Sequence, residues 1–308
     1  MGNKILDQNF ISSLGKNFEY LSHAYLFVSP DSTYNNLCAE IFASHILCEN
    51  KNFCGACPSC QKSIAKTNLD LTTLPTGRTI LAEDINLVVE KSLEKPMFGD
   101  FKVFILKEID SATIQAQNKL LKTLEEPPRH VVFILTATNE NKILPTIISR
   151  VRKIFLPRLN KKIVEEIILS PPPYLKEALP SKLNTNNLSE ALEEGEGWLG
   201  KTIELLKAES FPKMYAISQE IALSFSKSKD LPVLSAKVLE FKDSILKFLE
   251  ILGHSFEKLL REKGNLVYCE IITNINSAVE ELGRNVGANL IVDNLLMKIL
   301  EIKYNYNL

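Results

Sequence analysis

The sequence predicts an α/β protein in which a parallel-sheet domain is followed by an all-α region. Over residues 1–157, short apolar runs alternate with helical patterns, which is the order of a parallel sheet with helical crossovers. From about Phe211 onward the apolar spacing is purely helical. These two observations define the fold class.

Five strands are expected in the first region. Most of them are dense in β-branched or large apolar residues, which suits strands covered on both faces. The expected strands are Ala24–Val28, Leu69–Leu74, Lys102–Leu106, Val131–Thr136 and Lys153–Leu156. The expected helices between them are Asn36–Leu47, Ala82–Leu93, Ala112–Leu124 and Ile143–Ser149. Strands that alternate with helices in this way predict a doubly wound parallel sheet.

The strand signal fades after Pro157. Residues 158–208 form a pattern of short helices, broken by three consecutive prolines and by two glycines. Farther on, five apolar residues spaced three and four apart predict one face of a packed helix. These are Val238, Phe241, Ile245, Phe248 and Leu252, and a last helix is expected near Ala288–Lys303. We therefore expect three domains, 1–157, 158–208 and 209–308.

Composition restricts the class of protein. The 308 residues are 45% hydrophobic and 24% charged, which excludes collagen-like and disordered chains. The net charge of −1 does not indicate a nucleic-acid binder, although a local basic patch is compatible with it. No apolar run approaches the ~18 residues that span a bilayer, and the N-terminus lacks the apolar region of a signal peptide. We expect a soluble, cytoplasmic protein that does not enter a membrane.

Four of the six cysteines lie within thirteen positions and predict a metal site. They are Cys48, Cys54, Cys57 and Cys60. In a reducing compartment such a cluster indicates metal ligands before disulfides. Four thiolates suit a closed, tetrahedral, structural Zn²⁺ site. An iron–sulfur cluster, for which a further cysteine at the position of Ile64 is missing, and unmetallated thiols are the alternatives.

The first strand runs into the segment where a nucleotide-binding α/β domain carries its phosphate loop, G-x-x-x-x-G-K-[ST]. In such a loop, glycines let backbone N–H groups surround the phosphates, lysine neutralises charge and the hydroxyl binds Mg²⁺. The chain reads His23-Ala-Tyr-Leu-Phe and continues to the first cysteine of the cluster. This arrangement resembles the bacterial clamp-loader subunits, a family of AAA+ proteins.

When the sequence is aligned with the clamp-loader pattern without a gap, its phosphate loop is degenerate. The glycine positions hold Ser29, Ser32 and Tyr34, the lysine position holds Asn35, and the Mg²⁺-binding hydroxyl position holds Asn36. We expect the phenol of Tyr34 to crowd the loop. No cation remains to meet a γ-phosphate, and we expect no tightly bound ATP. Weak binding of an anion at the N-terminus of the helix after Asn35 is compatible with the pattern.

Two further catalytic positions of the resemblance are altered. The acidic motif reads Val103-Phe-Ile-Leu-Lys107-Glu108, so Lys107 replaces the metal-organising carboxylate and Glu108 is retained. Gly200 stands at the nucleotide-sensing arginine of the lid signature, with Lys201 beside it as an alternative cation. The resemblance therefore implies that the isolated chain is not an ATPase.

Other motifs of the resemblance are retained. The stretch from Asn118 to Pro128 differs from the family's Asn-Ala-Leu-Leu-Lys-Thr-Leu-Glu-Glu-Pro-Pro at one position. Thr138 stands at the sensor position and is expected to be a structural hydroxyl. Leu144-Pro-Thr-Ile-Ile-Ser149-Arg150-Val151 is similar to a motif whose arginine points at the nucleotide of the neighbouring subunit. The resemblance assigns Arg150 as a trans arginine finger; the alternative is a solvated surface arginine.

The resemblance points to the delta-prime type of clamp-loader subunit in the DNA polymerase III holoenzyme. It implies an AAA+ domain at 1–157 with an inserted zinc module at 48–60, a helical lid at 158–208 and a helical collar at 209–308. The implied partners are gamma/tau and delta subunits in a hetero-pentamer, with the sliding clamp and primed DNA met through the complex. Two alternatives remain: an ATP-hydrolysing gamma/tau-type subunit, and a zinc-stabilised interaction protein on the same fold.

Overall fold

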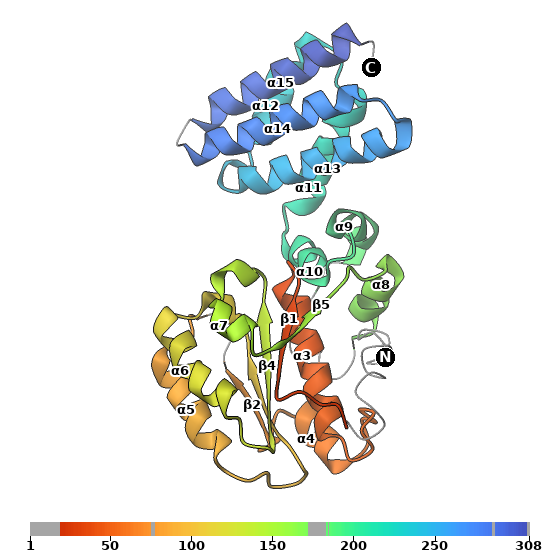
Figure 1. Cartoon of the computed structure of the whole chain (residues 1–308). Coiled ribbons are helices and arrows are strands. Elements are labelled where there is room, and N and C mark those ends of the chain that lie inside the picture. The colour runs from red at the N-terminus through yellow and green to blue at the C-terminus, as the bar shows by residue number, and fades with distance from the viewer. Residues whose placement is uncertain (1–18, 75–77, 172–182, 184, 285–286, 307–308) are drawn as a thin grey trace. The chain divides into compact units, whose positions relative to one another are not determined.

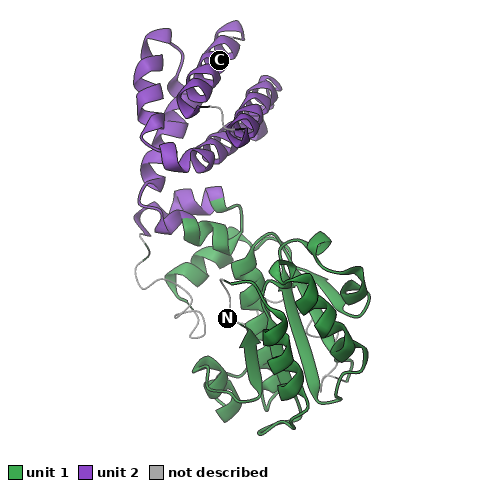
Figure 2. Ribbon diagram, turned by 90° about the vertical axis from the view of Figure 1, so that its left-hand side faces the viewer, with its two compact units in different colours: residues 1–183, 195–204 green, residues 184–194, 205–308 purple. Residues whose placement is uncertain are grey.

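The protein is described by a computed structural model that covers residues 19–74, 78–171, 183, 185–284 and 287–306. The chain divides into two compact units (Figure 2). The first comprises residues 1–183 and 195–204, and the second comprises residues 184–194 and 205–308. The expected 158–208 region is therefore shared between the two units. None of the described helices has the length and apolar character needed to cross a membrane.

The first unit is built on a five-stranded sheet in which each pair of neighbours is parallel (Figure 1). The strands are β1 (Ala24–Val28), β2 (Leu71–Leu74), β3 (Lys102–Leu106), β4 (Val131–Ala137) and β5 (Arg152–Phe155). Their order in the sheet is β2-β3-β4-β1-β5. The three central strands are buried along their whole length, whereas β2 and β5 at the edges are partly exposed. The sheet confirms the parallel α/β class expected from the sequence.

Helices cover both faces of the sheet. The helices of the first unit are α3 (Ser32–Leu47), α4 (Pro58–Ile64), α5 (Ala82–Ser92), α6 (Ile114–Glu125), α7 (Pro145–Ile148) and α8 (Lys161–Leu169). A further helix, α10 (Leu199–Lys207), begins in this unit and ends in the second. On one face, alternate strand residues such as Leu26, Phe104 and Phe133 pack with α5, α6 and α7. On the other face, the ring of Phe42 in α3 lies edge-on to Tyr25, with ring centroids 4.9 Å apart. Because both faces are covered, the central strands are uniformly apolar.

The second unit is all-helical, as the sequence predicts. Its helices are α9 (Leu188–Gly195), α11 (Phe211–Gln219), α12 (Leu231–Leu239), α13 (Ile245–Lys263), α14 (Val267–Gly283) and α15 (Ala288–Asn305). The packed pairs include α13 with α14, α14 with α15 and α12 with α15. The single helix expected from Val238 to Leu252 is wrong, because the chain breaks between α12 and α13. Its five apolar residues are nevertheless all buried.

A buried lysine joins α15 to a π-helical turn in the second unit. The turn, η4 (Glu220–Ser224), follows α11 directly. The Nζ atom of Lys303 donates to the carbonyl oxygens of Ile221 at 2.8 Å and Ala222 at 2.7 Å. Burial lowers the pKa of Lys303 to about 8, and the charge of Lys263 acts in the same direction. Lys303 therefore supplies the donor that these two buried carbonyls need.

Replacing Lys303 by Met is expected to destabilise the second unit by about 2 kcal/mol, because two buried carbonyls lose a charged donor. Chemical denaturation followed by circular dichroism measures the loss. The folded-state pKa of about 8 lies below the ordinary 10.5. The wild type should therefore gain stability over the variant as the pH rises from 8 towards 10.5.

Lys298→Met is the matched control, since Lys298 lies on the same helix and is exposed. Exposed substitutions of this kind change stability by about 0.5 kcal/mol or less. Equal effects of the two substitutions would show that the Lys303 hydrogen bonds contribute nothing.

Candidate functional site

The loop after β1 is shorter than the sequence predicts. The expected helix began at Asn36, whereas α3 begins at Ser32, so only Ser29, Pro30 and Asp31 separate it from the strand. Asp31 is the N-cap of α3, and its Oδ1 accepts a hydrogen bond from the backbone N–H of Tyr34 at 3.0 Å. The segment that would surround a phosphate is therefore already the first turn of a helix.

The Asp31 carboxylate also contacts the segment that holds the expected lid signature. Its Oδ2 accepts from the backbone N–H of Gly200 at 2.7 Å, next to the first residue of α10. Burial raises the pKa of Asp31, and hydrogen bonds from Tyr34, Gly200 and Thr33 oppose this shift. The carboxylate borders a cavity of about 260 Å³, which Lys201 and Glu204 also line. The alternative cation Lys201 thus lies near the loop, as the sequence allowed.

Asn35, at the lysine position, is a buried structural residue. Its Nδ2 donates to the carbonyl oxygens of Ser29 at 2.9 Å and Ala137 at 2.8 Å. Its Oδ1 accepts from the Ser29 hydroxyl at 2.6 Å. The side chain is fully buried, so it fastens the loop to the end of β4 and does not face a ligand.

Tyr34 does not crowd the loop as we expected from the sequence. Its side chain is 1% exposed and belongs to the core. Burial raises the pKa of its phenol, and the adjacent Cys38 thiol acts in the same direction. Two serines stand at glycine positions. The hydroxyl of Ser29 donates to Asn35, and Ser32 is the first residue of α3.

The acidic motif after β3 is held by internal contacts. Lys107, at the position of the metal-organising carboxylate, pairs with Glu40 of α3 at 2.6 Å. The Glu108 backbone N–H donates to the Thr136 hydroxyl at 2.9 Å. That hydroxyl donates in turn to Oδ1 of Asn36 at 2.8 Å. A cation therefore occupies the place where a catalytic site needs a carboxylate.

Thr138, at the sensor position, is hydrogen-bonded to a carboxylate of its own chain. Its hydroxyl donates to Oδ2 of Asp110 at 2.9 Å, and its backbone N–H donates to the same oxygen at 3.1 Å. The Asn139 N–H donates there as well, at 3.0 Å. Asp110 thus holds the turn that follows β4.

Arg150 lies just beyond α7, and its side chain is hydrogen-bonded to other residues of the same chain. Its Nη2 donates to Oε1 of Glu125 at 2.7 Å, and its Nη1 donates to the Thr146 carbonyl at 2.8 Å. The side chain remains one-third exposed. Glu125 belongs to the retained Asn118–Pro128 stretch, and the sequence analysis did not identify it as the partner of Arg150. The guanidinium is therefore positioned at the surface and is not a freely moving charge.

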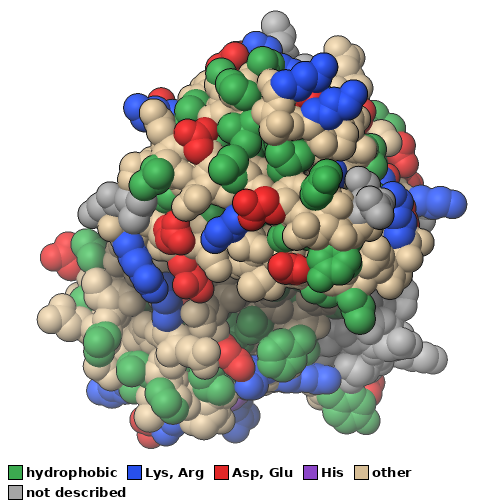
Figure 3. All heavy atoms as spheres, turned by 90° about the horizontal axis from the view of Figure 1, so that it is seen from above, with side chains coloured by type: hydrophobic (Ala, Val, Ile, Leu, Met, Phe, Trp, Pro, Cys, Tyr) green, Lys and Arg blue, Asp and Glu red, His purple; other side chains and the backbone are tan. Residues whose placement is uncertain are grey.

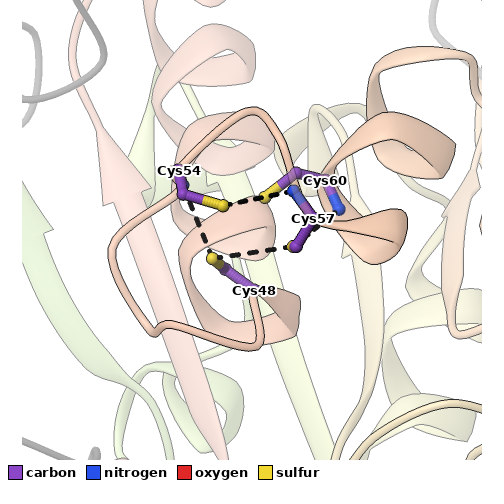
Figure 4. A group of neighbouring side chains, drawn as sticks. All are labelled: Cys48, Cys54, Cys57 and Cys60. Carbon is purple, nitrogen blue, oxygen red and sulfur yellow. Dashed lines mark hydrogen bonds between the residues drawn. The ribbon is translucent and has the colours of Figure 1, made fainter.

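The four cysteines converge as the sequence predicts (Figure 4). Cys48 directly follows α3, Cys54 and Cys57 lie in the next loop, and Cys60 lies in the first turn of α4. All four sulfur atoms lie within 4.8 Å of one another, and those of Cys48 and Cys57 are 4.0 Å apart. A tetrahedral ion with metal–sulfur bonds of about 2.3 Å needs sulfurs roughly 3.8 Å apart. The residues therefore fit a four-thiolate metal site.

Backbone N–H groups point at the cysteine sulfurs. The N–H of Cys57 donates to the Cys54 sulfur at 3.3 Å, and that of Cys60 donates to the Cys57 sulfur at 3.4 Å. Hydrogen bonds from Ala56 and Cys57 lower the pKa of Cys54 to about 6. Such bonds stabilise thiolates, which are the form that binds metal. The cysteines and Phe53 form a cluster separate from the sheet core.

A parallel α/β domain with an altered phosphate loop and a four-cysteine module defines the class of this protein. The family model described as "DNA polymerase III, delta subunit" matches residues 3–160, just over half of the 308 residues. The chain belongs to this family.

The curated relatives are longer than the matched part of this chain. DNA polymerase III subunit tau of Bacillus subtilis is 34% identical over 146 residues, covering 46% of this chain and 26% of that protein. The tau subunit of Escherichia coli is 32% identical over 158 residues, covering 50% and 24%. The gamma/tau subunit of Mycoplasma pneumoniae is 30% identical over 190 residues, covering 61% and 27%. The chain thus spans about a quarter of the length of these relatives.

A solved structure of a DNA polymerase III gamma-subunit-related protein from Thermotoga maritima also aligns with the chain. The alignment covers 95% of this chain and 99% of that one, with 17% identity and a TM-score of 0.49.

If the cysteine module holds zinc, elemental analysis of the purified protein should give about one zinc per chain. Cys57→Ser should release the metal and unfold residues 48–64, because metal binding is coupled to folding in such modules. The sheet should remain folded, since its core is separate. Hydrogen exchange distinguishes the two regions.

Cys269→Ser is the control, because Cys269 is an exposed free cysteine. It should leave the zinc content unchanged. Absence of metal from the wild type, or iron with visible absorption, would contradict the zinc assignment.

Proposed function

We propose that the chain is a non-hydrolysing, delta-prime-type subunit of the DNA polymerase III clamp loader. In this role it helps load the sliding clamp onto primed DNA in the cytoplasm and supplies Arg150 to the ATP of a neighbouring subunit. Its own phosphate loop serves as a structural element. The proposal combines the family membership with the state of the altered nucleotide site.

The observation that carries the proposal is that residues of the phosphate loop are hydrogen-bonded to other residues of the same chain. Asp31 takes the N–H groups that a phosphate would need, and Asn35 is bonded to the loop and to β4. Lys107 stands where the metal-organising carboxylate belongs and is paired with Glu40. An ATP phosphate would meet the Asp31 carboxylate and no lysine in this loop, and Mg²⁺ would meet Lys107.

Arg150 suits a role in trans because it does not depend on the altered site. An arginine delivered to the γ-phosphate of a neighbour stabilises the charge that develops during phosphoryl transfer. Its planar guanidinium binds phosphate oxygens in pairs, which lysine cannot reproduce. Glu125 holds the guanidinium while one-third of the side chain stays exposed. A neighbour's triphosphate would compete with Glu125 for the same donors.

The proposed partners are gamma/tau and delta subunits in a hetero-pentamer, with zinc as a structural ion in the cysteine module. DNA would be met through the assembled complex. On the face shown in Figure 3, lysine and arginine side chains are interspersed with acidic and apolar ones. The near-neutral net charge of −1 is consistent with this distribution.

The main alternative is an ATP-hydrolysing gamma/tau-type subunit. The names of the curated relatives favour it. The contacts of Asp31, Asn35 and Lys107 favour the non-hydrolysing role. A zinc-stabilised interaction protein on the same fold is a further alternative. Copurification of the tagged chain with gamma/tau and delta subunits would separate the clamp-loader roles from that last one.

The isolated protein is expected to bind no ATP in the micromolar range, because neither lysine nor glycines remain in its loop. Equilibrium dialysis with labelled ATP tests this, with a phosphate-loop ATPase as the positive control. Turnover above background that Glu108→Gln abolishes would favour the hydrolysing alternative.

Arg150→Ala should leave the chain folded and assembled but lower the clamp- and DNA-stimulated ATPase of the complex. The rate at the affected ATP site should fall about 10³-fold or more, as for arginine fingers in GTPases. The total rate should fall only in part, because other subunits would supply their own arginines. Steady-state ATPase and clamp-loading assays measure both effects.

Arg129→Ala is the matched control, since Arg129 is an exposed arginine of the same unit. If Arg150→Ala behaves like Arg129→Ala, Arg150 is a solvated surface charge. Loss of assembly would instead identify it as an interface residue.

A further inference from the structure

We infer that the Asp31 carboxylate is a built-in substitute for a bound anion, and that it latches the 195–204 segment onto the loop after β1. The inference concerns contacts within the first unit and does not depend on the clamp-loader role.

Two helix N-termini converge on this one carboxylate. Its Oδ1 accepts from the Tyr34 N–H in the first turn of α3, and its Oδ2 accepts from the Gly200 N–H in the first turn of α10. Each helix end carries free N–H groups and the positive end of its dipole. A phosphate at such a place would receive the same donors. Asp31 is 7% exposed, so the charge is held inside the protein.

Gly200 makes the close approach of α10 possible. A Cβ atom at this position would lie 2.4 Å from Oδ1 of Asp31 and 2.9 Å from the Thr33 hydroxyl. Any other residue would force the Asp31 carboxylate, the Thr33 side chain or α10 to shift. The glycine at the expected arginine position therefore takes part in a contact with Asp31. Asp31 supplies the negative charge. Gly200 supplies the backbone N–H donor and, because it has no side chain, allows the close approach.

The latch joins parts of the chain that are 169 residues apart in sequence. In a nucleotide-binding protein, a ligand that touches both the loop and the following helices would hold them together. In this chain the connection is a hydrogen bond to a side chain of the protein itself, so it needs no ligand. The segment should therefore stay attached to the loop at every nucleotide concentration.

A double-mutant cycle tests the latch. Asp31→Ala and Gly200→Ala should each lower the melting temperature of the first unit by about 2–6 °C, as expected for the loss of a cap or a steric clash. The drop in the double variant should be smaller than the sum of the two, because each substitution removes the interaction that the other disturbs. Hydrogen exchange at residues 199–204 should be faster in all three variants.

Two control variants distinguish loss of the contact between Asp31 and Gly200 from the general effects of removing an N-cap or replacing a glycine. Thr113→Ala removes the N-cap of α6, where the Thr113 hydroxyl oxygen accepts from the Ala116 N–H at 3.2 Å. It should lower stability without changing exchange at residues 199–204. Gly253→Ala lies inside α13, where the nearest atom to an added Cβ is 3.9 Å away, and should not destabilise. Additive effects of Asp31→Ala and Gly200→Ala, or unchanged exchange at 199–204, would overturn the latch.

Inorganic phosphate tests the anion position. In the Asp31→Gly variant the two helix ends lose their carboxylate, so millimolar phosphate should raise the melting temperature more than it does in the wild type and in Thr113→Ala. Equal shifts in all three proteins would show that Asp31 does not occupy an anion position.

Discussion

The unpaired N–H groups at the start of α3 impose the constraint on which the rest of this site depends. A helix that begins at the end of a buried central strand must find acceptors for its first N–H groups. A nucleotide phosphate meets this need in a phosphate-binding loop. In this chain Asp31 meets it, so the helix starts earlier and the loop shrinks to three residues.

Three positions that align with catalytic positions of the clamp-loader pattern make internal polar contacts in this chain. The residue at the lysine position bonds two backbone carbonyls, the one at the hydroxyl position accepts from Thr136, and the one at the carboxylate position forms an ion pair. Such contacts satisfy buried polar groups that would otherwise lower stability. Restoring a single catalytic residue would therefore break a structural contact without completing a site. The side chains at these three positions are all held by contacts within the chain.

Sequence reasoning predicted the parts of the structure that depend on local spacing. The cysteines converge because three of them lie three residues apart and the fourth ends a helix, and the central strands are apolar because both faces are covered. Contacts between distant residues were not predictable in this way. Glu125 is 25 residues from Arg150, and nothing in either motif indicates that they pair. The serine–proline–aspartate sequence before α3 did contain a usable signal, since aspartate is a favoured N-cap residue. The break between α12 and α13 was missed because apolar spacing continues across it.

The division of the chain into two units affects how the protein folds and where it can be truncated to give a stable fragment. The backbone passes from the first unit to the second after residue 183, returns at 195 and leaves again after 204. A fragment that ends at residue 183 would contain the whole sheet but lack Gly200, the distant partner of Asp31. During synthesis, the first unit cannot be completed until residue 204, far beyond the end of α8 at Leu169, has emerged. The contact of Asp31 with Gly200 therefore closes a long loop late. A fragment intended to represent the sheet domain should therefore extend through residue 204, and one that stops earlier would leave a buried carboxylate short of a donor.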